Sequence, residues 1–145
     1  MYIYYIGLGS NLGDTRANLL RAVELMNQRL GRVTALSSLY ETEPWGFRSE
    51  HMFCNAACRV KCPYAPQEVL DVTQQIERDL GRTRKSVKGQ YTDRVIDIDL
   101  LYCLDEAGQA VHIESPALCL PHPLIEQRPF VKQPLREIWV ERVHF

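Results

Sequence analysis

Apolar residues recur along the chain with two different periods, which predict alternating strands and helices. Alternation with a period of two predicts four strands, at residues 2–10, 33–42, 54–62 and 93–102. Apolar residues at helical spacing predict two helices, at residues 14–31 and 66–81. The order strand, helix, strand, strand, helix, strand is typical of an α+β protein with a ferredoxin-like βαββαβ core. We therefore expect a mainly antiparallel sheet with both helices on one face.

Residues that favour helix ends support these boundaries. Asn11 or Asp14 can cap the first helix, and Pro66 suits the first turn of the second. Gly31 and Gly81 follow the last apolar positions of the two helices, where glycine commonly ends a helix. Both helices therefore have a predicted start and a predicted end.

The last part of the chain is less regular. Residues 118–138 contain four prolines, which we expect to prevent a long regular helix. No internal repeat, linker or low-complexity segment interrupts the sequence, and 145 residues suit one hydrophobic core. We therefore expect a single domain over residues 1–145.

Composition and charge exclude several classes of protein. The chain is 46% hydrophobic and 24% charged, as in an ordinary soluble globule. With 17 basic and 18 acidic residues the net charge is −1, so no overall field attracts nucleic acid or an anionic membrane. The first residues lack the features of a signal peptide, and no apolar run approaches membrane-spanning length. We expect a cytoplasmic protein that binds neither nucleic acid nor membrane.

The five cysteines are odd in number and lack a C-x-x-C spacing, which favours reduced thiols over a disulfide framework. Cys54, Cys58 and Cys62 recur every four residues, a spacing that on a helix would suggest metal ligands. Here they fall on the apolar positions of an alternating segment. We interpret them as core residues rather than ligands.

Two aspartates stand inside an apolar strand. In the stretch DRVIDIDLLY, Asp97 and Asp99 are two residues apart, so they point to the same face, while Ile96 and Ile98 point to the other. Two neighbouring carboxylates repel each other unless a cation lies between them. The pair therefore suggests a cation site.

The segment before this strand is rich in basic residues. It spans Arg82 to Arg94 and also contains Arg84, Lys85 and Lys88, with Asp93 as its one acid. Basic side chains beside paired carboxylates are what a polyphosphate with magnesium requires. The alternative is a solvated basic loop that pairs with the aspartates. We expect the loop to be mobile in the absence of phosphate.

Other polar and aromatic residues are weaker candidates taken singly. Asn55 can read the edge of a ligand ring or bond to a loop, and His122 can contact a nucleotide or hold the chain. Phe53, Trp45 and Phe130 can stack on a flat heterocycle or simply pack in the core. The stretch GLGSNLGD lacks the lysine and Ser/Thr of a P-loop. We interpret it as a turn from strand to helix.

Taken together, these segments resemble the family of 6-hydroxymethyl-7,8-dihydropterin pyrophosphokinases of folate biosynthesis. The resemblance covers nearly the whole chain in the family's order, through YIGLGSNLGD, SSLYETEPWG, FCNAACRV, IERDLGRTRK, DRVIDIDLLY and LPHPLIEQRPFVKQPLREI. The sequence departs from the family at Thr92 and Asp93, where many members have glycine and proline.

The resemblance implies a ferredoxin-like enzyme that transfers diphosphate from ATP to the hydroxymethyl group of the dihydropterin and releases AMP. It implies two magnesium ions at Asp97 and Asp99, with Arg82 and Arg94 engaging the phosphates. The residues at the family's ATP-binding positions are Gln74, Glu77, Arg82, Arg84, Arg94, Ile98, His122 and Arg128. Those around its pterin pocket are Thr42, Pro44, Trp45, Phe53, Asn55 and Phe130. Both substrates are small molecules, and no obligate protein partner is expected.

Two other functions stay open at this point. One is a non-catalytic module that binds a nucleotide or a protein, and the other is a two-metal nucleotidyl transferase on a similar sheet. The products separate the three hypotheses, because the pyrophosphokinase releases AMP, the module releases nothing and the transferase releases pyrophosphate.

Overall fold

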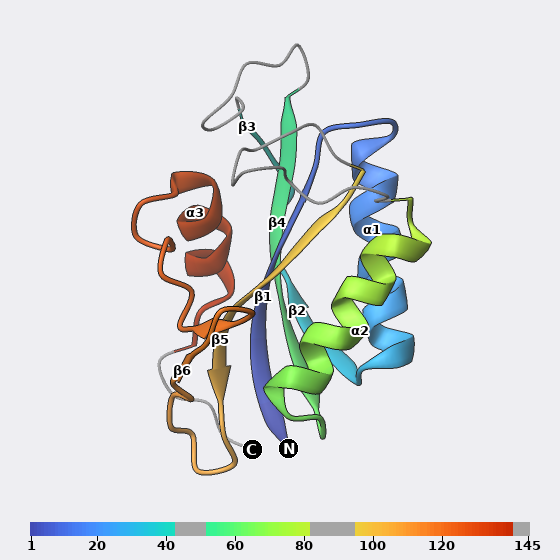
Figure 1. The fold of residues 1–145 in the computed structure, drawn as a ribbon. Coiled ribbons are helices and arrows are strands. Elements are labelled where there is room, and N and C mark those ends of the chain that lie inside the picture. Colours follow the sequence, from blue (N-terminus) through green and yellow to red (C-terminus); the bar gives the residue numbers. More distant parts are fainter. Residues whose placement is uncertain (43–51, 82–94, 141–145) are drawn as a thin grey trace.

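The computed structural model describes residues 1–42, 52–81 and 95–140 (Figure 1). In chain order its elements are β1 (Tyr2–Ser10), α1 (Thr15–Arg29), β2 (Arg32–Leu36), β3 (Tyr40–Thr42), β4 (Phe53–Cys62), α2 (Pro66–Asp79), β5 (Asp97–Leu104), β6 (Ile113–Glu114), β7 (Cys119–Leu120) and α3 (Pro129–Ile138). In the described residues, no helix is both long enough and apolar enough to span a bilayer.

The main sheet has the strand order β2-β4-β1-β5, with every neighbouring pair antiparallel, and β3 pairs with β4 beside β2. The elements β1, α1, β2, β4, α2 and β5 form the βαββαβ unit, so the predicted ferredoxin-like fold is confirmed. Strands β6 and β7 form a separate two-stranded sheet.

The two faces of the main sheet are covered by different helices. Helices α1 and α2 lie on one face, as predicted, and α3 lies on the other (Figure 1). Tyr4 and Ile6 of β1 belong to the larger core cluster with residues of α1 and α2. Ile3 and Tyr5 belong to the smaller cluster, which includes Leu135 of α3. Successive residues of β1 therefore point alternately into two separate cores, one under α1 and α2 and the other under α3.

A bulge in β5 changes which residues reach each core. Tyr5 is paired with Tyr102 and Ile6 with Leu100, so Leu101 is the extra residue. Both Leu101 and Tyr102 consequently pack on the side of α3, while Cys103 packs with α1 and α2. The sequence pattern did not predict this change of face.

The predicted strand at residues 33–42 is wrong in one respect, because the structure divides it into β2 and β3. At the break, Ser37 donates its N–H to the Ala57 carbonyl at 2.9 Å. The Ser37 hydroxyl accepts the Ala57 N–H at 2.9 Å and donates to the Ser38 carbonyl at 2.8 Å. A serine hydroxyl here replaces a backbone group of the ladder, so the strand bends without leaving β4 unpaired.

The proline-rich end of the chain forms a helix that the sequence analysis did not predict. Helix α3 has ten residues and contains Pro129 in its first turn and Pro134 in its interior. A proline in the first turn costs little, because the N–H it lacks has no partner within the helix. Burial of Leu135 and Ile138 against the sheet offsets the effect of Pro134.

The cysteines of β4 are core residues, as predicted. Cys54, Cys58 and Cys62 are buried in the cluster under α1 and α2. Burial raises the pKa of the Cys58 thiol to about 12. Because the thiolate is the reactive form, this position is chemically inert at neutral pH.

Gly31 follows α1, as predicted, but for a different reason. Its backbone is not in the left-handed conformation typical of a helix-ending glycine, whereas Gly81 after α2 has φ of 105°. A Cβ added at Gly31 would lie 2.8 Å from the Cβ of Cys62 and would also overlap the Lys61 carbonyl oxygen. Gly31 is therefore required by the close approach of the chain to β4.

Gly31→Ala should lower the free energy of unfolding by about 1–3 kcal/mol, because the added methyl group forces backbone of β4 to move. Urea denaturation followed by circular dichroism measures this. Gln28→Ala, an exposed change in the last turn of the same helix, is the control and should stay within about 0.5 kcal/mol of the parent. Equal stability of the two variants would contradict the packing role of Gly31.

Candidate active site

Asp97 and Asp99 lie at the start of β5 and point to the same face, as predicted. Both are half-buried, whereas Ile98 and Leu100 are buried in the core under α1 and α2. The aspartates share their face of β5 with Leu101, two residues beyond Asp99, and Leu101 packs on the α3 side. The two carboxylates therefore lie on the sheet face that α3 partly covers.

Glycines of β1 stand beside both aspartates. Gly9 is in register with Asp97 and Gly7 with Asp99. On its other side Gly9 is in register with Asn55 of β4, so Asn55, Gly9 and Asp97 form a row across three strands. The absence of a side chain at the middle position allows the Asn55 amide to lie close above β1, on the side of Asp97.

The space at Gly9 is already bounded by two predicted site residues. A Cβ added there would lie 3.1 Å from Asn55 Oδ1 and 3.8 Å from Phe53 Cδ1. The predicted strand at residues 2–10 is confirmed as β1, so the interpretation of GLGSNLGD as a turn is wrong for Gly7 and Gly9, which lie inside that strand. Glycines inside an alternating strand are the signal that would have indicated a close approach. Asp14, one of the two predicted caps, does cap α1 by accepting the Ala17 N–H at 3.1 Å.

Asn55 and Phe53 of β4 are also in register with the short strand β3. Tyr40 pairs with Asn55, and Thr42 pairs with Phe53. Helix α3 contacts both β3 and β4, and its start carries Phe130 next to the buried Arg128. The Arg128 guanidinium carbon lies 5.9 Å from the centre of the Phe130 ring. Phe53, Asn55 and Phe130 thus come from elements that touch one another.

Glu77 of α2 is buried and connects its helix to β5. Its Oε2 accepts the N–H of Ile98 at 2.9 Å. Because Ile98 lies between the two aspartates in the sequence, this bond holds the stretch of β5 backbone that carries both carboxylates. Gln74, another predicted ATP-binding residue, is half-buried one turn earlier on α2.

His122 is fixed at the edge of β5 by two hydrogen bonds. The backbone N–H of His122 donates to the Leu101 carbonyl at 2.8 Å, and the ring nitrogen Nδ1 accepts the backbone N–H of Leu124 at 3.1 Å. Burial lowers the pKa of the imidazole, while the negative charge of Asp97 opposes that change. With Nδ1 as an acceptor, the proton of the neutral ring is on Nε2, which makes that atom a donor.

Several predicted site residues lie outside the part of the chain that the structure describes. These are Pro44, Trp45, Arg82, Arg84 and Arg94, together with the side chain of Thr42. Lys85, Lys88, Thr92 and Asp93, and with them the expected mobility of this loop, lie there too.

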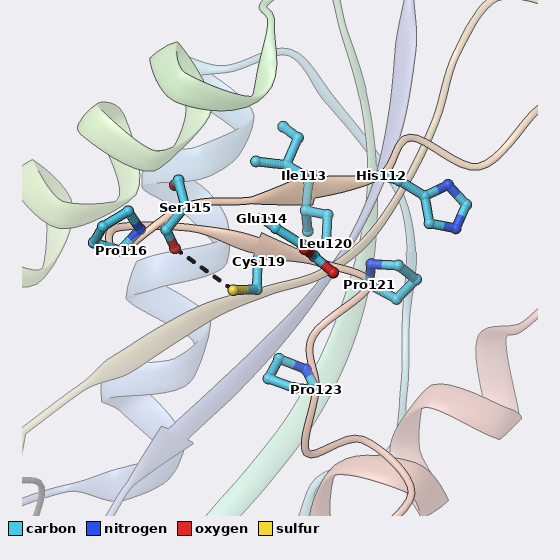
Figure 2. Close-up of a pocket in the computed structure, with 9 residues that line it drawn as sticks. All are labelled: His112, Ile113, Glu114, Ser115, Pro116, Cys119, Leu120, Pro121 and Pro123. Atoms are coloured by element: carbon cyan, nitrogen blue, oxygen red, sulfur yellow. Dashed lines mark hydrogen bonds between the residues drawn. The ribbon is translucent and has the colours of Figure 1, made fainter.

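A cavity of about 870 Å³ lies around the β6–β7 hairpin (Figure 2). Its lining includes Pro121 and Pro123, the two neighbours of His122, and Cys119, whose thiol donates to the Ser115 carbonyl at 3.6 Å. This cavity was not predicted from the sequence, because it forms only when residues 112–116 and 119–123 fold against each other.

The donor set fits magnesium bound mainly through a substrate. In the residues described, no group of three or more His, Cys, Asp or Glu side chains is placed to hold a metal ion. Magnesium is commonly held by one or two carboxylates together with waters and phosphate oxygens. Asp97 and Asp99, on one face beside two glycines, suit this mode of binding.

Comparison with known proteins identifies the family. The family model described as 7,8-dihydro-6-hydroxymethylpterin-pyrophosphokinase (HPPK) matches residues 5–140. The chain belongs to the HPPK family. The resemblance inferred from the sequence motifs is thereby confirmed.

Relatives in the HPPK family align over most of the chain. A Porphyromonas gingivalis protein named 2-amino-4-hydroxy-6-hydroxymethyldihydropteridine pyrophosphokinase is 49% identical over 140 residues, covering 95% of this chain and 91% of its own. A Bacillus subtilis protein of the same name is 42% identical over 137 residues, covering 94% of this chain and 77% of its own.

A solved structure of an HPPK-DHPS protein in complex with substrates has the same fold. Its TM-score is 0.70 at 14% identity, and the match covers 94% of this chain and 40% of that chain. At this level of identity the likeness concerns the fold alone.

Gly9→Ala should displace the Asn55 side chain, because a Cβ 3.1 Å from its Oδ1 is tighter than ordinary contact. We expect shifted side-chain amide signals of Asn55 in nitrogen-edited NMR spectra. Gly7→Ala is the matched control on the same face, since its Cβ would meet Leu101 at 3.3 Å and should perturb the Leu101 methyl signals instead. Unchanged Asn55 signals in Gly9→Ala would contradict the proximity of these two residues.

Proposed function

We propose that this protein transfers diphosphate from ATP to the hydroxymethyl group of 6-hydroxymethyl-7,8-dihydropterin and releases AMP, as a step of folate biosynthesis. The observation that carries the proposal is the row of Asn55, Gly9 and Asp97 in a member of the HPPK family. It brings a group that can read a ring edge and a group that can hold a cation onto one face of the sheet.

The phosphate end of the site is assigned to β5 and its surroundings. Asp97 and Asp99 hold two magnesium ions, which supply charge neutralisation and alignment of the polyphosphate when bound. Glu77 fixes the peptide between the two aspartates through the Ile98 N–H. Arg82 and Arg94 contact the phosphates from the basic segment that precedes β5.

The remaining ATP contacts are assigned around the edge of β5. His122 donates from Nε2 to a phosphate oxygen, because its Nδ1 is already occupied as the acceptor of the Leu124 N–H. The proposed set of further ATP-binding residues is Gln74, Glu77, Arg84, Ile98 and Arg128. The cavity around the β6–β7 hairpin, whose lining includes the two neighbours of His122, offers space for the nucleoside end of ATP.

The pterin is assigned to the space between β4 and the start of α3. Phe53 and Phe130 stack on the two faces of the ring, and Asn55 bonds to its polar edge. Thr42, Pro44 and Trp45 complete this pocket. The arrangement directs the hydroxymethyl group toward the aspartates across Gly9.

In the reaction, the hydroxymethyl oxygen forms a bond to the β-phosphorus of ATP. The bond from the β-phosphorus to the oxygen bridging the α-phosphate breaks, the hydroxyl proton is released and AMP leaves. No covalent intermediate on the protein is needed, so the residues act by positioning and by charge stabilisation. The partners are two small molecules without an obligate protein partner, and the cytoplasmic location expected from the sequence stays part of this proposal.

Asp97→Asn and Asp99→Asn should each lower turnover by at least about a hundredfold, because each removes a charge that holds the metal against the polyphosphate. The measurement is AMP formation from ATP, magnesium and the dihydropterin, with circular dichroism to verify the fold. Asp71→Asn, at an exposed position of α2, is the matched control and should retain activity. Release of pyrophosphate instead of AMP by the parent protein would identify a nucleotidyl transferase and exclude this function.

Asn55→Ala should weaken binding of the pterin far more than binding of ATP, because a polar ring edge left without a partner in a closed pocket is costly. Isothermal titration calorimetry with each ligand measures the two affinities. Asn27→Ala is the control, since Asn27 accepts the Val33 N–H at 3.0 Å at the far end of the sheet from this row. Equal losses for both ligands in Asn55→Ala would exclude its assignment to the pterin.

A further inference from the structure

Glu137, in the last turn of α3, accepts hydrogen bonds from three donors: two belong to Ser38, between β2 and β3, and one to Tyr40, at the start of β3. Its Oε1 accepts the Ser38 hydroxyl at 2.7 Å, and its Oε2 accepts the Tyr40 hydroxyl at 2.7 Å. The Ser38 N–H lies 3.0 Å from both carboxylate oxygens. An exposed carboxylate that satisfies a backbone N–H and two hydroxyls is a specific clamp rather than a solvated surface charge.

The ionisation of this cluster is consistent with a charge-assisted contact. Hydrogen bonds from Tyr40 and Ser38 hold the pKa of Glu137 below its usual value. The bond to Glu137 raises the pKa of Tyr40. The carboxylate is therefore charged, and the phenol is neutral, at neutral pH.

The clamp joins α3, which carries Phe130, to β3, which pairs with the strand that carries Asn55 and Phe53. Tyr40 begins β3, where it is in register with Asn55, and two residues later β3 is in register with Phe53. Glu137 belongs to α3, whose first turn carries Phe130. Strand β3 is only three residues long and, among the strands that the structure describes, pairs with β4 alone, so it depends on contacts outside the sheet for its position.

Ser37, next to Ser38, attaches the same stretch of chain to β4. Ser37 exchanges hydrogen bonds with Ala57, and Ala57 is in register with Gly7 beside Asp99. The chain between β2 and β3 is thus attached to β4 on one side and to Glu137 on the other. A shift of this segment moves β3 relative to α3.

We propose that Glu137 is a positioning residue for the pterin, which sets the separation between the wall formed by β3 and β4 and the wall formed by the start of α3. It touches neither substrate. It acts through Ser38 and Tyr40 on the position of β3, and hence on Asn55 and Phe53, relative to Phe130. This inference rests on the proposed function and adds a specificity-determining contact outside the residues assigned to the substrates.

Glu137→Ala is the main test, because it removes the acceptor of all three donors. We expect the dissociation constant for the dihydropterin to rise about tenfold, the typical effect of losing a hydrogen bond to a charged group. The dissociation constant for ATP with magnesium should stay within about twofold of the parent value. The clamp and the proposed ATP contacts share no residue, and distant sites without shared partners usually act independently. Calorimetry on the full chain measures both constants, and steady-state kinetics measures KM for each substrate.

Two further variants separate positioning from a loss of stability. Glu137→Gln keeps one carbonyl acceptor and should restore part of the pterin affinity. Tyr40→Phe removes one donor, and its effect on pterin affinity should be non-additive with that of Glu137→Ala in a double-mutant cycle. Additive effects, or no recovery in Glu137→Gln, would overturn the role of the clamp.

Asp79→Ala is the matched control on the opposite face of the sheet. Asp79 is also an exposed carboxylate that joins two elements, with Arg29 of α1 at 2.6 Å and Gln75 of its own helix at 2.8 Å. Its loss should lower stability without a selective effect on the pterin. Equal pterin affinity in Glu137→Ala and Asp79→Ala would overturn the inference while leaving the proposed function intact. Failure of the parent protein to form AMP would instead overturn the proposed function.

Discussion

The antiparallel register of β1 with its two neighbours is the constraint on which the site depends. Strand β1 lies between β4 and β5, and this register places Asn55, Gly9 and Asp97 in one row. Side chains alternate along a strand, so the same register that buries Tyr4 and Ile6 under α1 and α2 directs the polar row to the opposite face. A slip of one residue would bring the aspartates into the apolar core, where two adjacent charges are costly. Stability of the core and geometry of the site are therefore set by one interaction.

Contacts from outside the sheet then complete that geometry. Glu77 reaches from α2 to the peptide between the aspartates, and His122 is bound to the edge of β5 through the Leu101 carbonyl. Helix α3 closes the far side of the sheet and is attached to the β2–β3 segment through Glu137. Each contact comes from a different part of the chain, and each acts on backbone that carries site residues. The polar face is in this way held by a small number of hydrogen bonds rather than by a large core.

Much of the fold could be predicted because local pattern and tertiary burial agree. The strand at residues 54–62 alternates between apolar and polar positions, and its cysteines are buried as that pattern requires. The prediction failed where a side chain competes with the backbone or where burial outweighs a residue's propensity. Ser37 takes a place in the ladder and divides the predicted strand at 33–42. Burial of Leu135 and Ile138 sustains a helix through Pro134, against the low helix propensity of proline.

The sequence by itself determined the βαββαβ order, the shared face of Asp97 and Asp99, and the family, because periodicity and motifs are properties of neighbouring residues. Only the tertiary structure decided that Gly9 separates Asn55 from Asp97, that Glu77 holds the Ile98 N–H, and that Glu137 joins α3 to the β2–β3 segment. These contacts join residues 21 to 99 positions apart. No local preference encodes such a pairing. It arises when the strands of the sheet are brought into register and the helices pack on its two faces, which decides which distant polar groups come within hydrogen-bonding distance.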